Sequence, residues 1–182
     1  MRSSLVERAR SGEHAAFDAL VDLDGDRCLA IAFRITRDHA LAEDAVQQTL
    51  ITAWRELPRL REVDRYEMWL QRLLVNACYQ ELRKLRRWND RVAPLPPDGP
   101  AAADPYRSTE DRDALDRAFE RLAPDRRAIF VLHHHAGLPL ATVAQIVGLP
   151  VGTVKSRLHY ATDILRAALA ADARVQETGA RA

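Results

Sequence analysis

The chain has 182 residues, of which 47% are apolar and 29% are charged, and its formal net charge is +1. This length allows one generous domain or two small ones, and the apolar content is sufficient for each small domain to bury a core. No apolar run approaches the roughly 20 residues needed to span a bilayer, and the first residues lack the apolar core of a secretory signal. We therefore expect a soluble, cytoplasmic protein with no stable membrane insertion.

The small net charge conceals a segregation of charge along the chain. Residues 1–58 hold seven arginines and ten acidic residues, whereas residues 59–91 hold nine basic and five acidic residues. Residues 92–125 hold four arginines and eight acidic residues, and residues 126–182 hold seven basic and three acidic residues. Because affinity for DNA depends on the local density of cations, the two basic segments suggest two DNA-contacting surfaces. A chance fluctuation of surface charge is the alternative.

Apolar residues repeat with a helical period throughout, and none of the segments shows the alternation of a half-buried strand. This pattern predicts an all-α protein. One or two helical segments are expected first, at residues 17–21 and 29–35, broken or bent around residues 24–26. The strongest helix of this half is expected over residues 41–57, with Asp38 as its N-cap and a proline just beyond its end.

A further helix is expected after Asp64, which forms a capping-box-like start with Glu67. Residues 92–106 are rich in proline and lack periodicity, which predicts a linker between two domains. Ser108 or Thr109 can cap the next helix. We therefore expect two small helical domains with four helices each, divided into a first domain over residues 1–91, a linker over 92–107, a second domain over 108–171 and a disordered tail over 172–182.

The most specific pattern lies between residues 138 and 169, after a helix that is expected to run from Pro124 to Gly137. Gly148 ends one helix and Pro150 opens the next, with Ala144 small enough for close contact between them; this is the pattern of a helix-turn-helix. Val154 and Leu158 lie one turn apart as a buried stripe. The opposite face of the second helix carries groups that suit phosphates and base edges in a major groove: Thr153, Lys155, Ser156, Arg157 and His159.

A second polar face is expected on the helix that includes residues 76–91. Asn76, Gln80 and Arg83 line one side of this helix, because residues three and four apart lie above one another. Two amides beside a guanidinium group can hydrogen-bond a base edge or a phosphate. For the basic run of residues 83–87, a merely solvated helix end is the alternative.

A short basic loop, residues 58–64, precedes that helix and carries Arg59 and Arg61. Tyr66 and Trp69 follow it. Aromatic rings beside a basic loop suit unstacked bases, for which stacking contributes about 1–3 kcal/mol per base. The alternative for Trp69 is a role as an anchor in the core.

Four polar residues lie opposite the apolar stripe of the helix over residues 41–57. Simple exposure to solvent and docking of a basic protein partner both agree with this pattern, and spacing alone does not separate them. These residues are Glu43, Asp44, Gln47 and Gln48.

Other residues with reactive side chains do not form a recognisable catalytic or metal site. Adjacent residues on a helix point about 100° apart, so the run of residues 133–135, all histidines, cannot meet one ion. At least one of these histidines is expected between helices and the others in solvent. Cys28 and Cys78 fit no metal-ligand spacing and are interpreted as reduced, buried thiols, with a redox role as the minor alternative. We expect no cofactor, no metal and no enzymatic activity.

Together these segments resemble a bacterial RNA polymerase sigma factor of the sigma-70 family, in the extracytoplasmic-function (ECF, group IV) class. Residues 41–57 resemble region 2.2, residues 67–87 resemble regions 2.3 to 2.4, and residues 115–169 resemble region 4. The last match is the most specific, because it combines VGTVKSRLHYA with the upstream LAPDRRAIF pattern. The sequence departs from the family at Gln80, where many members have Asp or Asn. It also lacks the Gly-Xaa-Phe pattern that is usual before the tryptophan, here Trp69, and has Asp64-Arg65-Tyr66 instead.

The resemblance implies a division of labour between the two domains. Region 2 would dock on the clamp coiled coil of the polymerase β′ subunit through Glu43, Asp44, Gln47 and Gln48. It would also open the −10 element and capture a flipped base, with matching positions at Arg61, Trp69, Asn76, Gln80, Arg83 and Arg87. Region 4 would contact the β flap and read the −35 element as duplex, with matching positions at Lys155, Ser156, His159 and Tyr160, and with Thr153 and Arg157 nearer the backbone.

The expected function is that of a sigma factor, which binds core RNA polymerase, directs it to promoter DNA and promotes melting. Because members of this family commonly bind an anti-sigma factor, the resemblance also implies such a partner. The main alternative is a two-domain LuxR-like helix-turn-helix regulator, whose recognition helix also often contains Thr-Val-Lys. Such proteins usually carry a sensing domain rich in strands, whereas residues 1–91 have a helical pattern. An RNA-modifying or metal-dependent enzyme that uses the histidine run is a second alternative.

Overall fold

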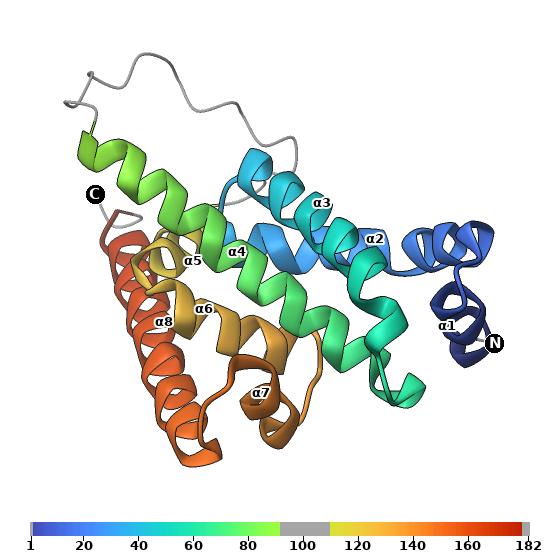
Figure 1. The fold of residues 1–182 in the computed structure, drawn as a ribbon. Helices are drawn as coiled ribbons and strands as arrows, with labels where there is room; N and C mark the ends of the chain where they lie inside the picture. Colours follow the sequence, from blue (N-terminus) through green and yellow to red (C-terminus); the bar gives the residue numbers. More distant parts are fainter. Residues whose placement is uncertain (1, 92–109, 180–182) are drawn as a thin grey trace.

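The computed structural model describes residues 2–91 and 110–179, and every regular element in these two ranges is helical (Figure 1). The predicted all-α fold is therefore confirmed for the described part of the chain. The first range holds α1 (Arg2–Arg10), α2 (His14–Thr36), α3 (His39–Glu56) and α4 (Tyr66–Arg91). The second holds α5 (Glu110–Arg121), α6 (Pro124–Phe130), α7 (Leu140–Val147) and α8 (Val151–Gly179). Two 3-10 turns, η1 (Leu57–Arg59) and η2 (Val63–Arg65), connect α3 to α4, and a π-helical turn, η3 (Val131–His135), follows α6.

Helix α3 forms where the sequence predicts the strongest helix. The Asp38 side chain accepts a hydrogen bond from the backbone N–H of Leu41 at 2.9 Å, which satisfies one of the free amides of the first turn. Three small residues, Ala42, Ala45 and Ala53, are fully buried and let α3 pack closely against α2 and α4. The opposite face of α3 is thereby left to solvent.

Helix α2 is continuous through residues 24–26, where the sequence predicts a break or bend within one or two helical segments. The glycine in this stretch costs a helix about 1 kcal/mol relative to alanine. Burial of Leu20 and Ile31 on either side contributes about 1.5–3 kcal/mol each, which outweighs that cost. The buried Asp24 is paired with Arg2 of α1 at 2.9 Å. Of the one or two segments that the sequence predicts, the structure has one, and it is not broken.

Two helix beginnings also differ from the prediction. Four helices precede the linker as expected, but the first is α1, which the sequence analysis did not identify because its apolar pattern is too short. Val6 and Ala9 of α1 are nonetheless completely buried. Helix α4 begins at Tyr66, after η2, and the expected cap residue Asp64 makes no capping hydrogen bond to the residues that the structure describes.

Helices α7 and α8 form the predicted helix-turn-helix. Gly148 adopts a left-handed conformation with φ +70°, and its N–H donates to the carbonyl of Ala144 at 2.9 Å, which ends α7. Pro150 directly precedes α8. In α8, Val154 is completely buried and Leu158 is half-buried, so the predicted stripe faces the interior.

The remaining elements of the second half pack on α8. Ala118 of α5 and Leu122, directly after that helix, meet Ala161 and Leu165 of α8 in a small apolar cluster. Pro124 opens α6, as expected. Helix α8 continues to Gly179, whereas the sequence analysis expected a disordered tail from residue 172. The predicted linker and the possible caps Ser108 and Thr109 lie outside the described residues.

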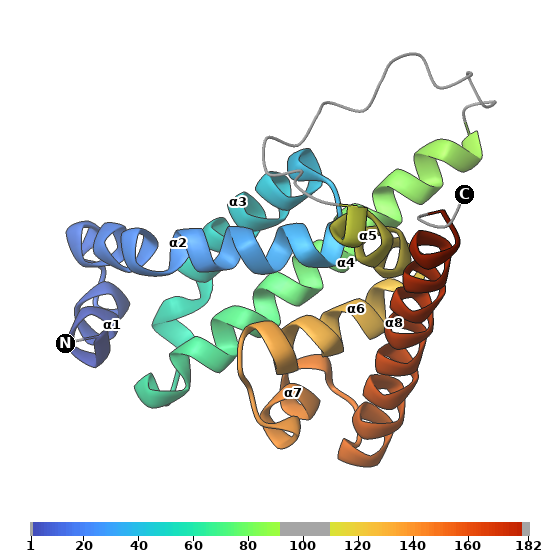
Figure 2. The same ribbon diagram turned by 180° about the vertical axis from the view of Figure 1, so that it is seen from behind.

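The two halves share one buried core rather than standing apart (Figure 2). Helix α4 packs on α7, and α2 packs on α6 and η3. At the end of α2, Arg37 has φ +63° and pairs with Asp116 of α5 at 2.8 Å. In both views α1 lies at the end of the molecule away from α8. Among the described helices, none combines the length and apolar character that a membrane span needs.

Candidate nucleic-acid interface

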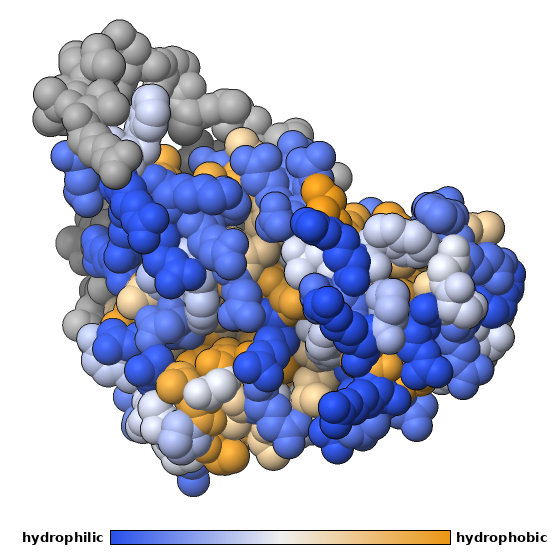
Figure 3. Space-filling model, in the orientation of Figure 1, coloured by the Kyte–Doolittle hydropathy of each residue, from blue (hydrophilic) through white to orange (hydrophobic). Residues whose placement is uncertain are grey.

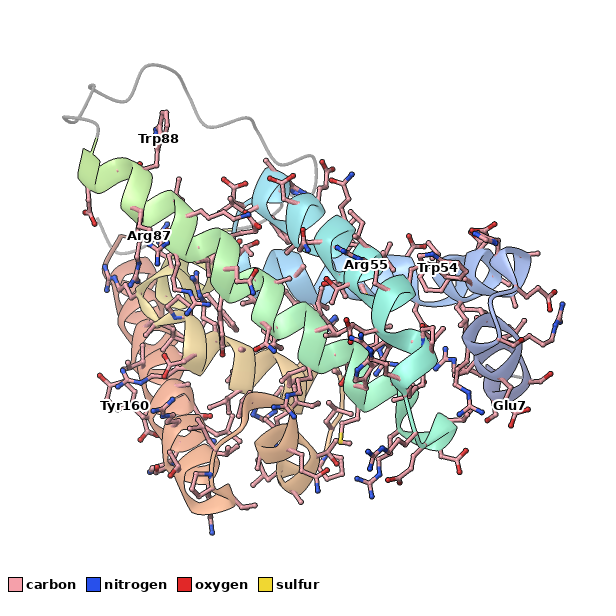
Figure 4. All side chains as sticks on the ribbon, viewed as in Figure 1. Glu7, Trp54, Arg55, Arg87, Trp88 and Tyr160 are labelled. Atoms are coloured by element: carbon pink, nitrogen blue, oxygen red, sulfur yellow. The ribbon has the colours of Figure 1, made fainter. Side chains whose placement is uncertain are left out.

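The predicted DNA-facing residues of α8 lie opposite its buried stripe. Lys155, Ser156, His159 and Tyr160 are exposed, and Thr153 is half-buried because it lies at the edge of the stripe. The Ser156 hydroxyl donates to the carbonyl of Thr153 at 3.0 Å, which leaves its lone pairs available. Figure 4 shows Tyr160 on the outer side of α8. The helix thus presents donors and an aromatic ring on one solvent-facing side.

Three residues of this face already have partners within the domain. Arg157 pairs with Asp125 of α6 at 2.6 Å, and His159 lies 3.3 Å from Asp163 one turn further along α8. The guanidinium carbon of Arg126 lies 4.1 Å from the centroid of the Tyr160 ring, a cation–π contact. Arg126 was not identified from the sequence, because its relation to Tyr160 depends on the packing of α6 on α8.

The second predicted face lies on α4, with Asn76, Gln80, Arg83 and Arg87 all exposed. Leu74 and Cys78, on the other side of the helix, are completely buried, so the helix is firmly anchored. No hydrogen bond or ion pair joins the amides of this face to another described residue. This surface therefore differs from that of α8, where most cations and rings are already engaged.

The far part of α4 adds groups that the sequence analysis did not assign. Arg86 is exposed, and Trp88 is 67% exposed and points away from the body of the molecule in Figure 4. Arg83 lines a cavity of about 300 Å³ between α4 and the start of α6, together with Tyr79 and Asp125. Burial and the nearby carboxylate of Asp125 raise the pKa of the Tyr79 phenol. Arg83 thus lies where the two halves meet, rather than on an isolated surface.

In the loop between α3 and α4, Arg61 is exposed to solvent, and Trp69 follows the loop in the first turn of α4. Trp69 is half-buried against the core, with its ring 6.0 Å from that of Tyr66. Both sequence interpretations of Trp69 are therefore compatible with its position. Arg59 is paired with Glu56 at 2.9 Å.

The four candidate docking residues of α3 form an exposed face, as predicted: Glu43, Asp44, Gln47 and Gln48. The amide nitrogen of Gln48 donates to the hydroxyl of Thr52 at 3.3 Å. Ile51, on the same helix, is 47% exposed, so an apolar residue accompanies the polar ones. Figure 3 shows that this face of the molecule is mainly hydrophilic, with small separate apolar areas.

The histidines and cysteines have the structural environments expected from the sequence. His133 is half-buried, with Nδ1 2.8 Å from the carbonyl of Leu138, whereas His134 and His135 are exposed. No group of three or more potential metal ligands gathers within the described ranges. Both thiols are free and buried, and burial raises the pKa of Cys28 to about 11 and that of Cys78 to about 12. Thiols with such pKa values are poor nucleophiles at neutral pH.

Comparison with known proteins identifies the family. The model of Sigma-70 region 2 matches residues 20–88, and that of Sigma-70, region 4 matches residues 112–161. SigL, an ECF RNA polymerase sigma factor of Mycobacterium tuberculosis (strain H37Rv), is 34% identical over 172 residues, covering 90% of this chain and 94% of SigL. The chain belongs to the ECF RNA polymerase sigma factors. A sigma factor directs RNA polymerase to promoters, and this is the role of the chain.

Other sigma factors agree with this assignment. The ECF sigma factor SigW of Bacillus subtilis (strain 168) is 25% identical, with 88% of this chain and 92% of SigW covered. Among solved structures, CnrH in complex with the cytosolic domain of CnrY has a TM-score of 0.68 and 26% identity, covering 94% of this chain and 98% of CnrH. The sigma factor RpoE of Bartonella quintana, in complex with the anti-sigma factor NepR, has a TM-score of 0.70 and 27% identity, covering 84% and 96% of the two chains.

Proposed function

We propose that the two exposed helix faces of this sigma factor read the two elements of its promoters. The observation that carries the proposal is their arrangement: each polar face lies on a helix anchored by a completely buried residue, Leu74 in α4 and Val154 in α8. One face belongs to the segment that matches region 2 and the other to the segment that matches region 4. We assign the first domain to residues 1–91 and the second to residues 108–171.

In this proposal the α8 face binds the −35 element as duplex DNA. Lys155 and Tyr160, with Ser156 and His159, approach base edges, whereas Thr153 and Arg157 lie nearer the phosphates. The exposed positions of the first four residues support this assignment. For Arg157 to contact a phosphate, it exchanges its pairing with Asp125 for a pairing with DNA.

The α4 face and the preceding loop bind the −10 element as it opens. Amides and cations on α4 contact base edges and phosphates, and the loop that carries Arg61 captures an unstacked base with Trp69 beside it. The proposed −10 set is Arg61, Trp69, Asn76, Gln80, Arg83 and Arg87. All of these except the half-buried Trp69 are exposed, which supports the assignment.

The exposed face of α3 docks on core RNA polymerase. Glu43, Asp44, Gln47 and Gln48 provide an acidic and amide surface that is complementary to a basic partner, which we assign to the clamp coiled coil of β′, with the second half of the chain on the β flap. We also propose that the protein works in the cytoplasm without catalytic activity of its own. We further propose that an anti-sigma factor binds and regulates it, because the similar sigma factor RpoE forms a complex with the anti-sigma factor NepR.

Run-off transcription over a library of genomic promoters, with core polymerase in the presence and absence of the protein, tests the proposal. We expect transcripts that depend on the protein and that begin downstream of a shared pair of elements. Asp44→Arg separates the roles, because it is expected to abolish binding to core polymerase in a pull-down. Unchanged core binding by this variant would overturn the docking assignment, and the absence of any protein-dependent transcript would overturn the proposed function.

A further inference from the structure

Helix α1 lies directly beside the loop that connects α3 to α4. Figures 1 and 2 both place α1 next to this loop at the same end of the molecule, and α1 contacts both η1 and η2. Helix α1 also precedes residues 20–88, the part matched by the region 2 model, so this model assigns it no role.

The helix is attached to the body of the protein along its whole length. Val6 and Ala9 are completely buried, which fixes its apolar side. At its N-terminal end, Arg2 is paired with Glu67 in the first turn of α4 and with Asp24 of α2, the latter at 2.9 Å. Helix α1 has nine residues, and the burial of Val6 and Ala9 keeps it ordered against the rest of the protein, so it can restrain the elements that it contacts.

The opposite end of α1 holds the loop itself. The Nη1 atom of Arg10 donates a hydrogen bond to the carbonyl oxygen of Leu60 at 3.2 Å, in a half-buried setting. This carbonyl belongs to the peptide group that joins Leu60 to Arg61. The bond therefore fixes the orientation of the peptide group directly before the Cα atom of Arg61. Helix α1 thus contacts the loop at its middle and the chain just after the loop, at Glu67.

Apolar contacts also hold the loop, because Leu60 and Val63 are half-buried against the core. Leu57 is completely buried at its beginning, but the ion pairs of Arg59 with Glu56 and of Arg65 with Glu62 are local and exposed, and surface pairs of this kind contribute about 0–1 kcal/mol. A cavity of about 200 Å³ is lined by residues of both α1 and η2, so the two elements are not closely packed over their whole contact. Among the described residues, the hydrogen bond from Arg10 is the one polar contact that another element makes with the backbone in the middle of the loop.

We propose that α1 is a positioning element for this loop, and that Arg10 is a positioning residue that holds it in the shape that captures an unstacked base of the −10 strand. The inference rests on the role proposed above for the loop and adds a residue outside the matched region. A preformed loop loses less conformational freedom on binding, which raises its affinity for single-stranded DNA. Arg10 itself need not touch the DNA.

The test measures binding of the holoenzyme to a fluorescent single-stranded oligonucleotide that carries the non-template −10 sequence found by run-off transcription. Arg10→Met keeps the half-buried aliphatic stem but removes the donors. We expect its affinity for the oligonucleotide to fall about three- to tenfold, since a hydrogen bond from a charged donor is lost. Binding to core polymerase and to a −35 duplex is expected to stay unchanged.

Two further variants separate positioning from a general loss of structure. Arg8→Met is the matched control, because Arg8 lies on the same helix but pairs with Glu13 rather than with the loop. It is expected to bind the oligonucleotide as the unmodified protein does. Arg10→Lys retains a donor that can reach the carbonyl and is expected to restore part of the affinity.

Each outcome has a definite meaning. Full affinity in Arg10→Met, an equal loss in Arg8→Met, or a parallel loss of −35 duplex binding would overturn the role of Arg10 while leaving the proposed function intact. If the unmodified holoenzyme does not prefer the −10 strand to a scrambled strand, the role of the loop fails, and this inference fails with it.

Discussion

The two helices assigned to promoter DNA, α4 and α8, are anchored in the same way but present their polar groups differently. On α4 the amides of Asn76 and Gln80 have no hydrogen-bonding partner among the described residues, so they are free to meet a base. On α8, by contrast, Arg157 is paired with Asp125 at 2.6 Å. The exposed Tyr160 ring on the same helix lies under a cation from α6.

This difference suggests different binding energetics for the two faces. Side chains that are free on α4 lose rotamer freedom when they bind, whereas those of α8 are already partly ordered but must exchange a partner within the protein for DNA. The α4 face is suited to strands whose positions change during melting, and the α8 face to a duplex of fixed geometry.

The largest effect is expected from removing the buried anchors that the two helices have in common. Leu74→Ala should lower the free energy of unfolding by about 2–5 kcal/mol, because it leaves a cavity in a completely buried site. Val154→Ala removes fewer buried carbons and should cost less, at about 0.8 kcal/mol for each buried CH₂ group that is lost. Urea denaturation measures both. Arg72→Ala, at an exposed position of α4, is the control and should leave the denaturation midpoint unchanged.

A smaller effect is expected for a single cation of the α8 face. Lys155→Ala should weaken binding to a −35 duplex by about 1–3 kcal/mol, because the exposed ammonium group is assigned to a base edge. Fluorescence anisotropy with a labelled duplex measures this loss. Binding to the −10 oligonucleotide should not change. A similar loss with both DNA probes would contradict the separation of the two faces.

A gain of affinity is expected when the partner of Arg157 is removed. Asp125→Asn frees the guanidinium group for a phosphate, and because exposed ion pairs contribute about 0–1 kcal/mol, we expect an increase in −35 affinity of up to about fivefold. The slope of log affinity against log salt concentration should become steeper by about one, because binding releases about one more counterion from the DNA. Asp163→Asn, which removes the partner of His159, is the matched comparison. Reduced affinity in Asp125→Asn would show that the pair orders α8 rather than competing with DNA.

The smallest effect concerns pH and the two exposed histidines of η3. Burial and neighbouring His133 lower the pKa of His134 below its usual 6.5, and burial and the nearby arginines of α2 lower that of His135. Since the unfolded chain then takes up protons more readily than the folded one, the free energy of unfolding should fall as the pH drops below about 6.5. Urea denaturation at pH 7.5 and 5.5 should show a smaller fall for the His134→Gln/His135→Gln variant. An equal fall in both proteins would contradict the sign of these shifts.

The sequence predicts best those elements whose signals are local. The cap at Asp38, the glycine at the end of α7 and the apolar stripe of α8 all act within one or two turns, and each is present in the structure. The exposed faces of α3, α4 and α8 follow from the same helical period. Short-range stereochemistry was thus sufficient to place these side chains.

What the sequence could not predict depends on contacts between distant segments. Helix α1 is too short for a clear period and is stabilised by its burial against the rest of the chain, through Val6 and Ala9. The continuity of α2 depends on packing on both sides of its glycine. The contact of Arg126 with Tyr160 requires α6 to lie on α8. Helix α8 also runs further than expected, because nothing in its sequence marks a stop before residue 179.

The core that α2 and α4 share with α6, η3 and α7 has a consequence for modularity. Sigma factors with two recognition domains invite the construction of chimaeras in which one domain is exchanged for that of a relative. Here Leu132 and Val143 belong to the same buried cluster as Ile31 and Leu74. A foreign second half would therefore bring a mismatched surface against the first, and exchanges that respect these four positions should yield better-folded hybrids than those chosen at the linker alone.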